Sequence, residues 1–210
     1  MIVVPIYDMI ILPGVTFYFK QDVFQELEIE DVKEGEELIF LYQKEDKARQ
    51  SLTEEDFYPI GVEGKVEGID RDGNINVRTF HRVDIHNIEV TEGNISLEAV
   101  NRDEIEDIDA QECQMRFEKM RTSLLRFAQG FQWGVWARSY ILHWKSISEV
   151  VSALSSYLNL TNEERYQIVE TDVLSQRIEK MEHAVYEFIE VTRVGEEAEN
   201  AQQERHEKVY

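Results

Sequence analysis

Few residues in this sequence have the type and spacing that chemistry requires. Glu179, His183 and Glu187 follow one another at intervals of four, which places them on one face of a helix. Such a face could hold a metal ion, but a solvated polar stripe is the simpler interpretation. His81 and His86 stand five apart in a predicted strand, so their side chains point to opposite faces and make a poor metal pair. We therefore predict no metal site.

The motifs of nucleotide binding and nucleophilic catalysis are also missing from the sequence. Gly64-Lys65 is followed by Val66, whereas a phosphate-binding P-loop has Ser or Thr after its lysine. No serine stands at a sharp strand-to-helix turn of the kind that exposes a nucleophile. The single cysteine, Cys113, has no second thiol for a disulfide or a zinc site. We predict a chain with no catalytic residue and no cofactor.

A cluster of aromatic side chains is the most unusual feature. All three tryptophans lie within twelve residues, and Trp133, Trp136, Tyr140 and Trp144 fall on one face of a predicted helix, just after Phe131. Core packing is the simpler interpretation. The alternative is a partly exposed groove for unfolded polypeptide, because degenerate recognition needs broad apolar surface more than specific hydrogen bonds.

A second candidate surface lies near the amino terminus. Leu12, Pro13 and Val15 form an apolar turn, and Phe17 follows in a segment where apolar and polar residues alternate. A turn of this kind could also accept apolar segments. The candidate substrate-binding residues are therefore Leu12, Pro13, Val15, Phe17, Trp133, Trp136 and Tyr140.

The charge of the chain limits its partners. Forty-three Asp and Glu residues oppose 22 Lys and Arg residues, giving a net charge of -21 that repels phosphate backbones and anionic lipid. Residues 22–37 and 103–112 hold much of the acid, and a solvated surface is a simpler interpretation of them than a site for a basic partner. No apolar run approaches the roughly 20 residues that span a bilayer, and no signal peptide opens the sequence. We expect a cytoplasmic protein that binds neither nucleic acid nor membrane.

The elements that would position these residues begin with a hairpin. Apolar residues alternate on both sides of the turn 70–74, in which Gly73 can adopt positive φ at low cost, so residues 57–85 are predicted to form a β-hairpin. Three glycines in its first strand predict a curved sheet. Other strands are predicted at 2–6, 9–12, 15–19, 38–42, 83–90 and 95–99, the first two of which could be one kinked strand. Segment 22–33 could be helix or strand.

The period of the apolar residues changes to that of helices from residue 101. A long helix is predicted to start near there and to end at Gly130, with Ser146 and Thr161 opening two further helices through capping boxes. Thr171 or Asp172 is predicted to cap a last helix, which turns polar on all sides after residue 195. A bundle or oligomer seam is predicted along it at Leu174, Ile178, Met181, Val185 and Phe188.

Motifs along the chain resemble the amino-terminal, substrate-binding domain of the Lon family of ATP-dependent proteases. The resemblance rests on residues 4–8 and 12–14, on 43–46 and 55–61, on the hairpin turn with Arg82, and on 162–173. Tyr7 departs from the family's arginine. The Val-Gly-Arg element expected near 19–21 is absent, so the conformation of 20–34 stays open.

The resemblance implies a six-stranded PUA-like pseudobarrel or sandwich in residues 1–100, an α-helical bundle in 101–194 and the polar start of a longer helix in 195–210. It also implies binding of unfolded or damaged proteins for a hexameric ATPase and protease, with those catalytic domains in the parent chain and none of their residues here. The alternative is a free-standing adaptor of the same fold that binds one specific ligand or partner. A nucleic-acid-binding PUA-like module is disfavoured by the charge.

Overall fold

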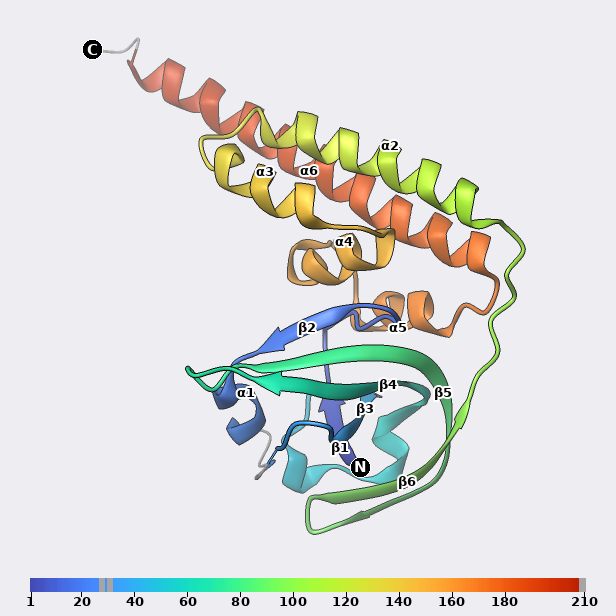
Figure 1. Ribbon diagram of the computed structural model, residues 1–210. Coiled ribbons are helices and arrows are strands. Elements are labelled where there is room, and N and C mark those ends of the chain that lie inside the picture. Colours follow the sequence, from blue (N-terminus) through green and yellow to red (C-terminus); the bar gives the residue numbers. More distant parts are fainter. Residues whose placement is uncertain (27–28, 30–31, 208–210) are drawn as a thin grey trace.

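The computed structural model describes residues 1–26, 29 and 32–207. Its strands are β1 (Ile2–Ile6), β2 (Thr16–Phe19), β3 (Glu37–Gln43), β4 (Phe57–Ile69), β5 (Ile75–Thr91) and β6 (Asn94–Asn101). Its α-helices are α1 (Gln21–Glu26), α2 (Ala110–Ala128), α3 (Gly134–His143), α4 (Ile147–Ala153), α5 (Asn162–Glu170) and α6 (Leu174–Glu207). Figure 1 shows the strands in one half of the molecule and α2, α3 and α6 in the other, with α4 and α5 between them. The predicted α+β fold is confirmed.

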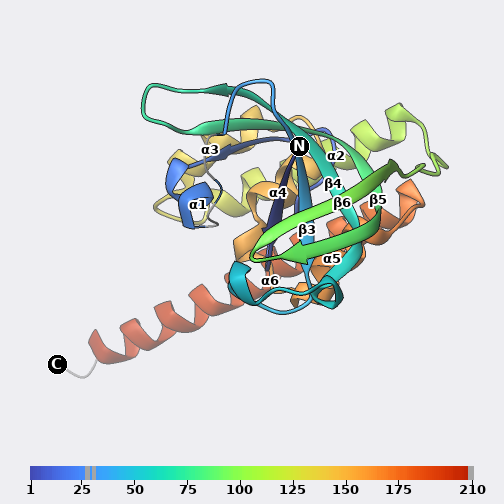
Figure 2. The same ribbon diagram turned by 90° about the horizontal axis from the view of Figure 1, so that it is seen from below.

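One mixed sheet contains all the strands that the structure describes. The strand order is β1-β3-β4-β5-β2, and β6 pairs with the far end of β5. β1 and β3 run parallel, and the other neighbours are antiparallel. Because β5 is 17 residues long, it pairs with β2 near its start and with β6 near its end. The sheet therefore bends around β5, as Figures 1 and 2 show.

The predicted hairpin is formed by β4 and β5. Gly73 has a φ of 84°, and Asp70 accepts hydrogen bonds from the backbone of Asp72 and Asn74 across the turn. Two register shifts, between Val62 and Gly64 and between Val66 and Gly68, interrupt the pairing and let the strands bend. The curvature expected from the glycines is therefore present.

β3 is buried on both faces, as its continuous apolar run predicts. Leu38, Phe40 and Tyr42 belong to the main hydrophobic cluster, whereas Ile39 and Leu41 point into a smaller one on the opposite side. The main cluster continues from the sheet into the helices, where Met120, Val150 and Val185 are among its members. The predicted division at residue 100 is a change of secondary structure inside one apolar cluster, and its status as a domain boundary stays a prediction.

The prediction of strand at residues 9–12 is wrong, because these residues form no strand. They are a buried irregular segment whose polar groups are satisfied by side chains. The Tyr42 hydroxyl donates to the Ile11 carbonyl at 2.7 Å and accepts from the Ile11 N–H at 3.0 Å. Ser155 Oγ accepts from the Ile10 N–H at 2.8 Å. Hydrogen bonds from distant residues thus replace those of a sheet. Segment 22–33 opens with helix α1, and residues 27, 28, 30 and 31 lie outside the described residues.

The connection between the halves also differs from the prediction, because α2 begins at Ala110 and not near residue 101. Asp109 caps it by accepting from the Glu112 N–H at 2.8 Å. Upstream, Ile105 bridges to Val173, and its N–H donates to the Asp172 carbonyl at 3.1 Å. Residues 102–109 are therefore tied to the start of α6 in an extended form that helical periodicity cannot reveal.

Of the four predicted helix starts, those of α4 and α5 lie where their capping residues were predicted. Thr161 and Glu164 form the full capping box of α5. Only half of the capping box predicted at Ser146 forms: its hydroxyl accepts from the Glu149 N–H, but the Glu149 carboxylate accepts from the Lys145 N–H.

The predicted cap of α6 is wrong for both candidates: the Thr171 hydroxyl donates to the Gln167 carbonyl at 2.6 Å, and Asp172 binds arginines. Asp107 accepts from the Ser175 N–H at 2.9 Å. α6 runs on past α2 and α3 (Figures 1 and 2), and residues 208–210 lie outside the described residues. None of the helices in the described part is both long and apolar enough to cross a membrane.

Candidate functional site: an exposed aromatic helix and a cavity between the halves

Helix α3 presents its aromatic residues to solvent. Trp133, Trp136 and Tyr140 are 46%, 76% and 66% exposed. Core packing therefore does not explain these three residues, although Trp144 is partly buried against the core. Val135 and Leu142 are exposed as well, so α3 shows apolar side chains on more than one face. These two residues were not among the predicted site residues, and the signal that could have found them is the lack of a polar face on α3. We call Trp133, Val135, Trp136, Tyr140 and Leu142 the α3 surface.

α3 is held against the end of α2 by close packing. A methyl group on Gly134 would lie 1.7 Å from the Ala128 carbonyl oxygen, so only glycine fits there. Phe131 stacks on Trp133 with ring centroids 4.6 Å apart, and Phe127 meets Phe131 edge to face at the same distance. These contacts fix the start of α3 and the orientation of its first tryptophan.

The amino-terminal turn is not the exposed surface that the sequence suggested. Leu12 and Val15 are only 1% and 4% exposed, and Pro13 and Phe17 are partly buried. The Thr79 hydroxyl holds the turn by donating to the Leu12 carbonyl at 2.6 Å, and the Val15 N–H donates to the same hydroxyl at 3.0 Å. Leu12 and Val15 thus belong to the core cluster, and Leu12 and Pro13 also line a cavity between the halves. Alternation of residue types cannot distinguish a buried turn from an exposed one.

The predicted seam of α6 packs inside this chain. Ile178, Met181 and Val185 are buried, and Leu174 and Phe188 pack against the same cluster. α6 lies against α2, α4 and α5. The seam therefore joins helices of one bundle. On the polar face Glu179 and His183 are exposed, and the described residues hold no group of three His, Cys, Asp or Glu that could share a metal ion.

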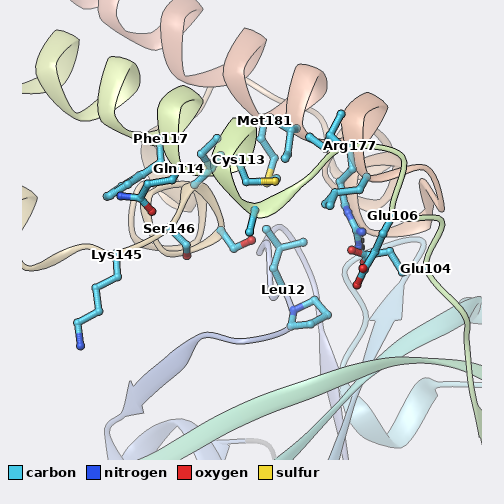
Figure 3. Close-up of a pocket in the computed structure, with 17 residues that line it drawn as sticks. Leu12, Glu104, Glu106, Cys113, Gln114, Phe117, Lys145, Ser146, Arg177 and Met181 are labelled. Carbon is cyan, nitrogen blue, oxygen red and sulfur yellow. Dashed lines mark hydrogen bonds and ion pairs between the residues drawn. The ribbon is translucent and has the colours of Figure 1, made fainter.

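A cavity of about 400 Å³ lies where the two halves meet. Its wall is formed by the turn at Leu12, the connection 104–108, the first turns of α2 and α4, and the start of α6. Leu12, Phe117, Ile147 and Met181 give it an apolar interior, and Cys113 also lines it (Figure 3). We call this space the junction cavity. No sequence motif could reveal it, because its residues come from five separate segments.

Charged groups at one end of the junction cavity belong to a network that joins the halves. Arg177 pairs with Glu104 in the cavity wall (Figure 3). Beside them Arg82, which is 2% exposed, donates to Asp172 at 2.9 Å, and burial together with the charge of Arg177 lowers its pKa. Arg102 also binds Asp172, at 2.7 Å, and this contact, with that of Arg82, holds the pKa of the Asp172 carboxyl below its usual value.

Known proteins share this arrangement of strands and helices. The N-terminal domain of the Mycobacterium avium complex Lon protease has a similar fold, with a TM-score of 0.55 at 18% identity over 88% of this chain and 96% of that one. The Lon protease of Clostridium beijerinckii is 24% identical over 179 residues, which cover 83% of this chain and 22% of that protein. The chain thus spans about a fifth of the length of this relative.

The family follows from a match over most of the chain. Residues 1–185 match the model of the ATP-dependent protease La (LON) substrate-binding domain. The chain belongs to the LON substrate-binding domain family, which confirms the resemblance found in its motifs. This domain is the non-catalytic part of Lon.

Proposed function

We propose that the chain recognises unfolded or damaged polypeptides for a Lon-type ATP-dependent protease and takes no part in the chemistry itself. The family match supports the class, and the α3 surface is the single observation that supports the mode of binding. Trp136 and Tyr140 offer large, rigid apolar area to solvent, which suits partners that share exposed apolar residues and no common sequence.

The same proposal includes the setting of the domain. We propose that in the parent protein the chain is joined to ATPase and protease domains and that the whole assembles as a homo-oligomer in the cytoplasm. The share of the Clostridium beijerinckii relative that the chain covers supports this setting. One domain would bind an unfolded segment weakly, because the segment loses conformational entropy on docking. Several copies in one assembly would raise the affinity through effective concentration.

The test is a titration of a permanently unfolded, fluorescently labelled protein with the wild type and with the double variant Trp136→Ser, Tyr140→Ser. Both side chains are largely exposed, so the variant should fold normally. We expect its Kd to rise about tenfold or more, because each aromatic anchor contributes about 1 kcal/mol or more to such contacts.

A matched control removes apolar area elsewhere. Tyr18 on β2 is 75% exposed and Ile69 on β4 is 44% exposed, so Tyr18→Ser with Ile69→Ser removes comparable surface from the sheet. This variant should bind as the wild type does. Equal weakening by both double variants would reject the α3 surface as the binding site. If the wild type binds one folded partner and no unfolded protein, the free-standing adaptor is the better description.

A further inference from the structure

The junction cavity is suited to binding a bulky apolar side chain. Its volume of about 400 Å³ and its apolar interior would accept a large aliphatic or aromatic group, and Glu104 and Glu106 of the acidic connection form part of its lining. It is separate from the α3 surface, since the two share no residue. A second apolar site in one small domain would let a substrate be held at two points.

The charges at one end of the junction cavity favour a positively charged partner. Arg177 is neutralised by Glu104. Lys145 also lines the cavity, but it lies at the other end and points away from the other labelled side chains (Figure 3). Glu106, at the same end as Arg177, has no hydrogen bond or ion pair with any other described residue. Within the cavity, the pKa of Cys113 is raised by burial and then by the negative charges of Glu112 and Asp109. The unpaired charge at this end is therefore negative.

We propose that the junction cavity binds an apolar side chain of a polypeptide that carries Lys or Arg beside it, with the basic group paired to Glu106. This inference rests on the proposed function, because it specifies which segments of an unfolded substrate the domain prefers. The preference follows from charge complementarity: a basic neighbour meets Glu106 and the net charge of -21, whereas an acidic neighbour meets both with the same sign.

Cys113 makes the site measurable without a label. It is the single cysteine of the chain and lines the junction cavity, so an occupant should slow its alkylation by N-ethylmaleimide. The probes are three synthetic peptides of one length: a phenylalanine between two lysines, the same phenylalanine between two glutamates, and a serine between two lysines. We expect protection by the first peptide, protection at about three- to fivefold higher concentration or none by the second, and none by the third.

Three variants test the contacts. Glu106→Lys should remove the preference for the lysine peptide, whereas Glu67→Lys, an equal charge change on an exposed residue of β4, should leave it intact. Gln114 lines the cavity and is exposed, so Gln114→Trp should block entry and abolish peptide protection while the chain stays folded. In 1 M salt the difference between the two charged peptides should shrink, because charges at the surface are screened.

The outcomes separate this inference from the proposed function. Unfolded protein that binds through the α3 surface while no peptide protects Cys113 would overturn the inference and leave the proposed function standing. Equal protection by the lysine and glutamate peptides would overturn the charge preference. A preference for the lysine peptide that is lost in Glu106→Lys and kept in Glu67→Lys would support it even if the α3 variants bind normally.

Discussion

Asp172→Asn is the substitution that tests most directly how the two halves are joined. Asp172 Oδ1 accepts from Arg82 Nη1 at 2.9 Å and from Arg102 Nε at 2.7 Å, and Oδ2 accepts from Arg102 Nη2 at 2.7 Å. Asparagine keeps the shape and one acceptor oxygen but removes the charge. Arg82 would then be left buried without its carboxylate, close to the positive Arg177.

The expected loss can be worked from these contacts. Removing one partner of a fully buried ion pair costs about 3–5 kcal/mol. Two features reduce the cost here: the Asp172 side chain is 34% exposed, and Arg82 Nη1 also donates to the Val169 and Thr171 carbonyls at 3.0 and 3.2 Å. We therefore expect Asp172→Asn to lower the free energy of unfolding by about 2–3 kcal/mol.

The assay is urea unfolding followed by tryptophan fluorescence and by circular dichroism, with Asp103→Asn as the control. Asp103 lies in the same connection, and its side chain has no hydrogen bond or ion pair with the other described residues. The control should stay within about 0.5 kcal/mol of the wild type. If Asp172→Asn also stays within that range, the network does not hold the halves together.

The pH dependence adds a second check on the same group. Because the folded pKa of Asp172 lies below that of the unfolded chain, its stabilisation is complete above the unfolded value of about 3.9 and is lost as the pH falls through the folded value. The difference between the wild type and Asp172→Asn should therefore be constant near neutral pH and shrink below about pH 4. A difference that persists at lower pH would mean that the charge of Asp172 is not its source.

Two glycine substitutions test local geometry, each with a second glycine substitution as its control. Gly73→Val should cost about 1–3 kcal/mol in urea unfolding because φ is 84°, whereas Gly68→Val, with open space at its Cβ, should cost little; equal midpoints would reject the turn. Gly134→Ala should shift α3 and cost about 1–3 kcal/mol, with a changed tryptophan emission spectrum. The control is Gly130→Ala, whose Cβ would lie 3.4 Å from its nearest neighbour and which should leave the emission spectrum unchanged. An unchanged spectrum in Gly134→Ala as well would show that the close contact is absent.

The parts of the fold that sequence predicted are those set by local pattern. The hairpin of β4 and β5 follows from alternation and a turn glycine, and the start of α5 follows from Thr161 and Glu164. Residues 9–12 and 102–109 were mispredicted because their hydrogen bonds go to distant groups, such as the Tyr42 hydroxyl and the Asp172 carbonyl. The candidate site was predictable to the same extent. The aromatic cluster could be found from the sequence, but its exposure and the junction cavity depend on how separate segments pack.

The contact at Gly134 has a consequence for the binding proposed at the α3 surface. With no side chain between the two backbones, α3 cannot rock against α2 without separating Gly134 from the Ala128 carbonyl. This close approach restricts movement of the helix that carries the exposed aromatics, so in the proposed binding mode little of their freedom would be lost when a polypeptide docks on them. An unfolded polypeptide must lose its own disorder on binding, so a rigid receptor confines the entropic loss to one side of the complex.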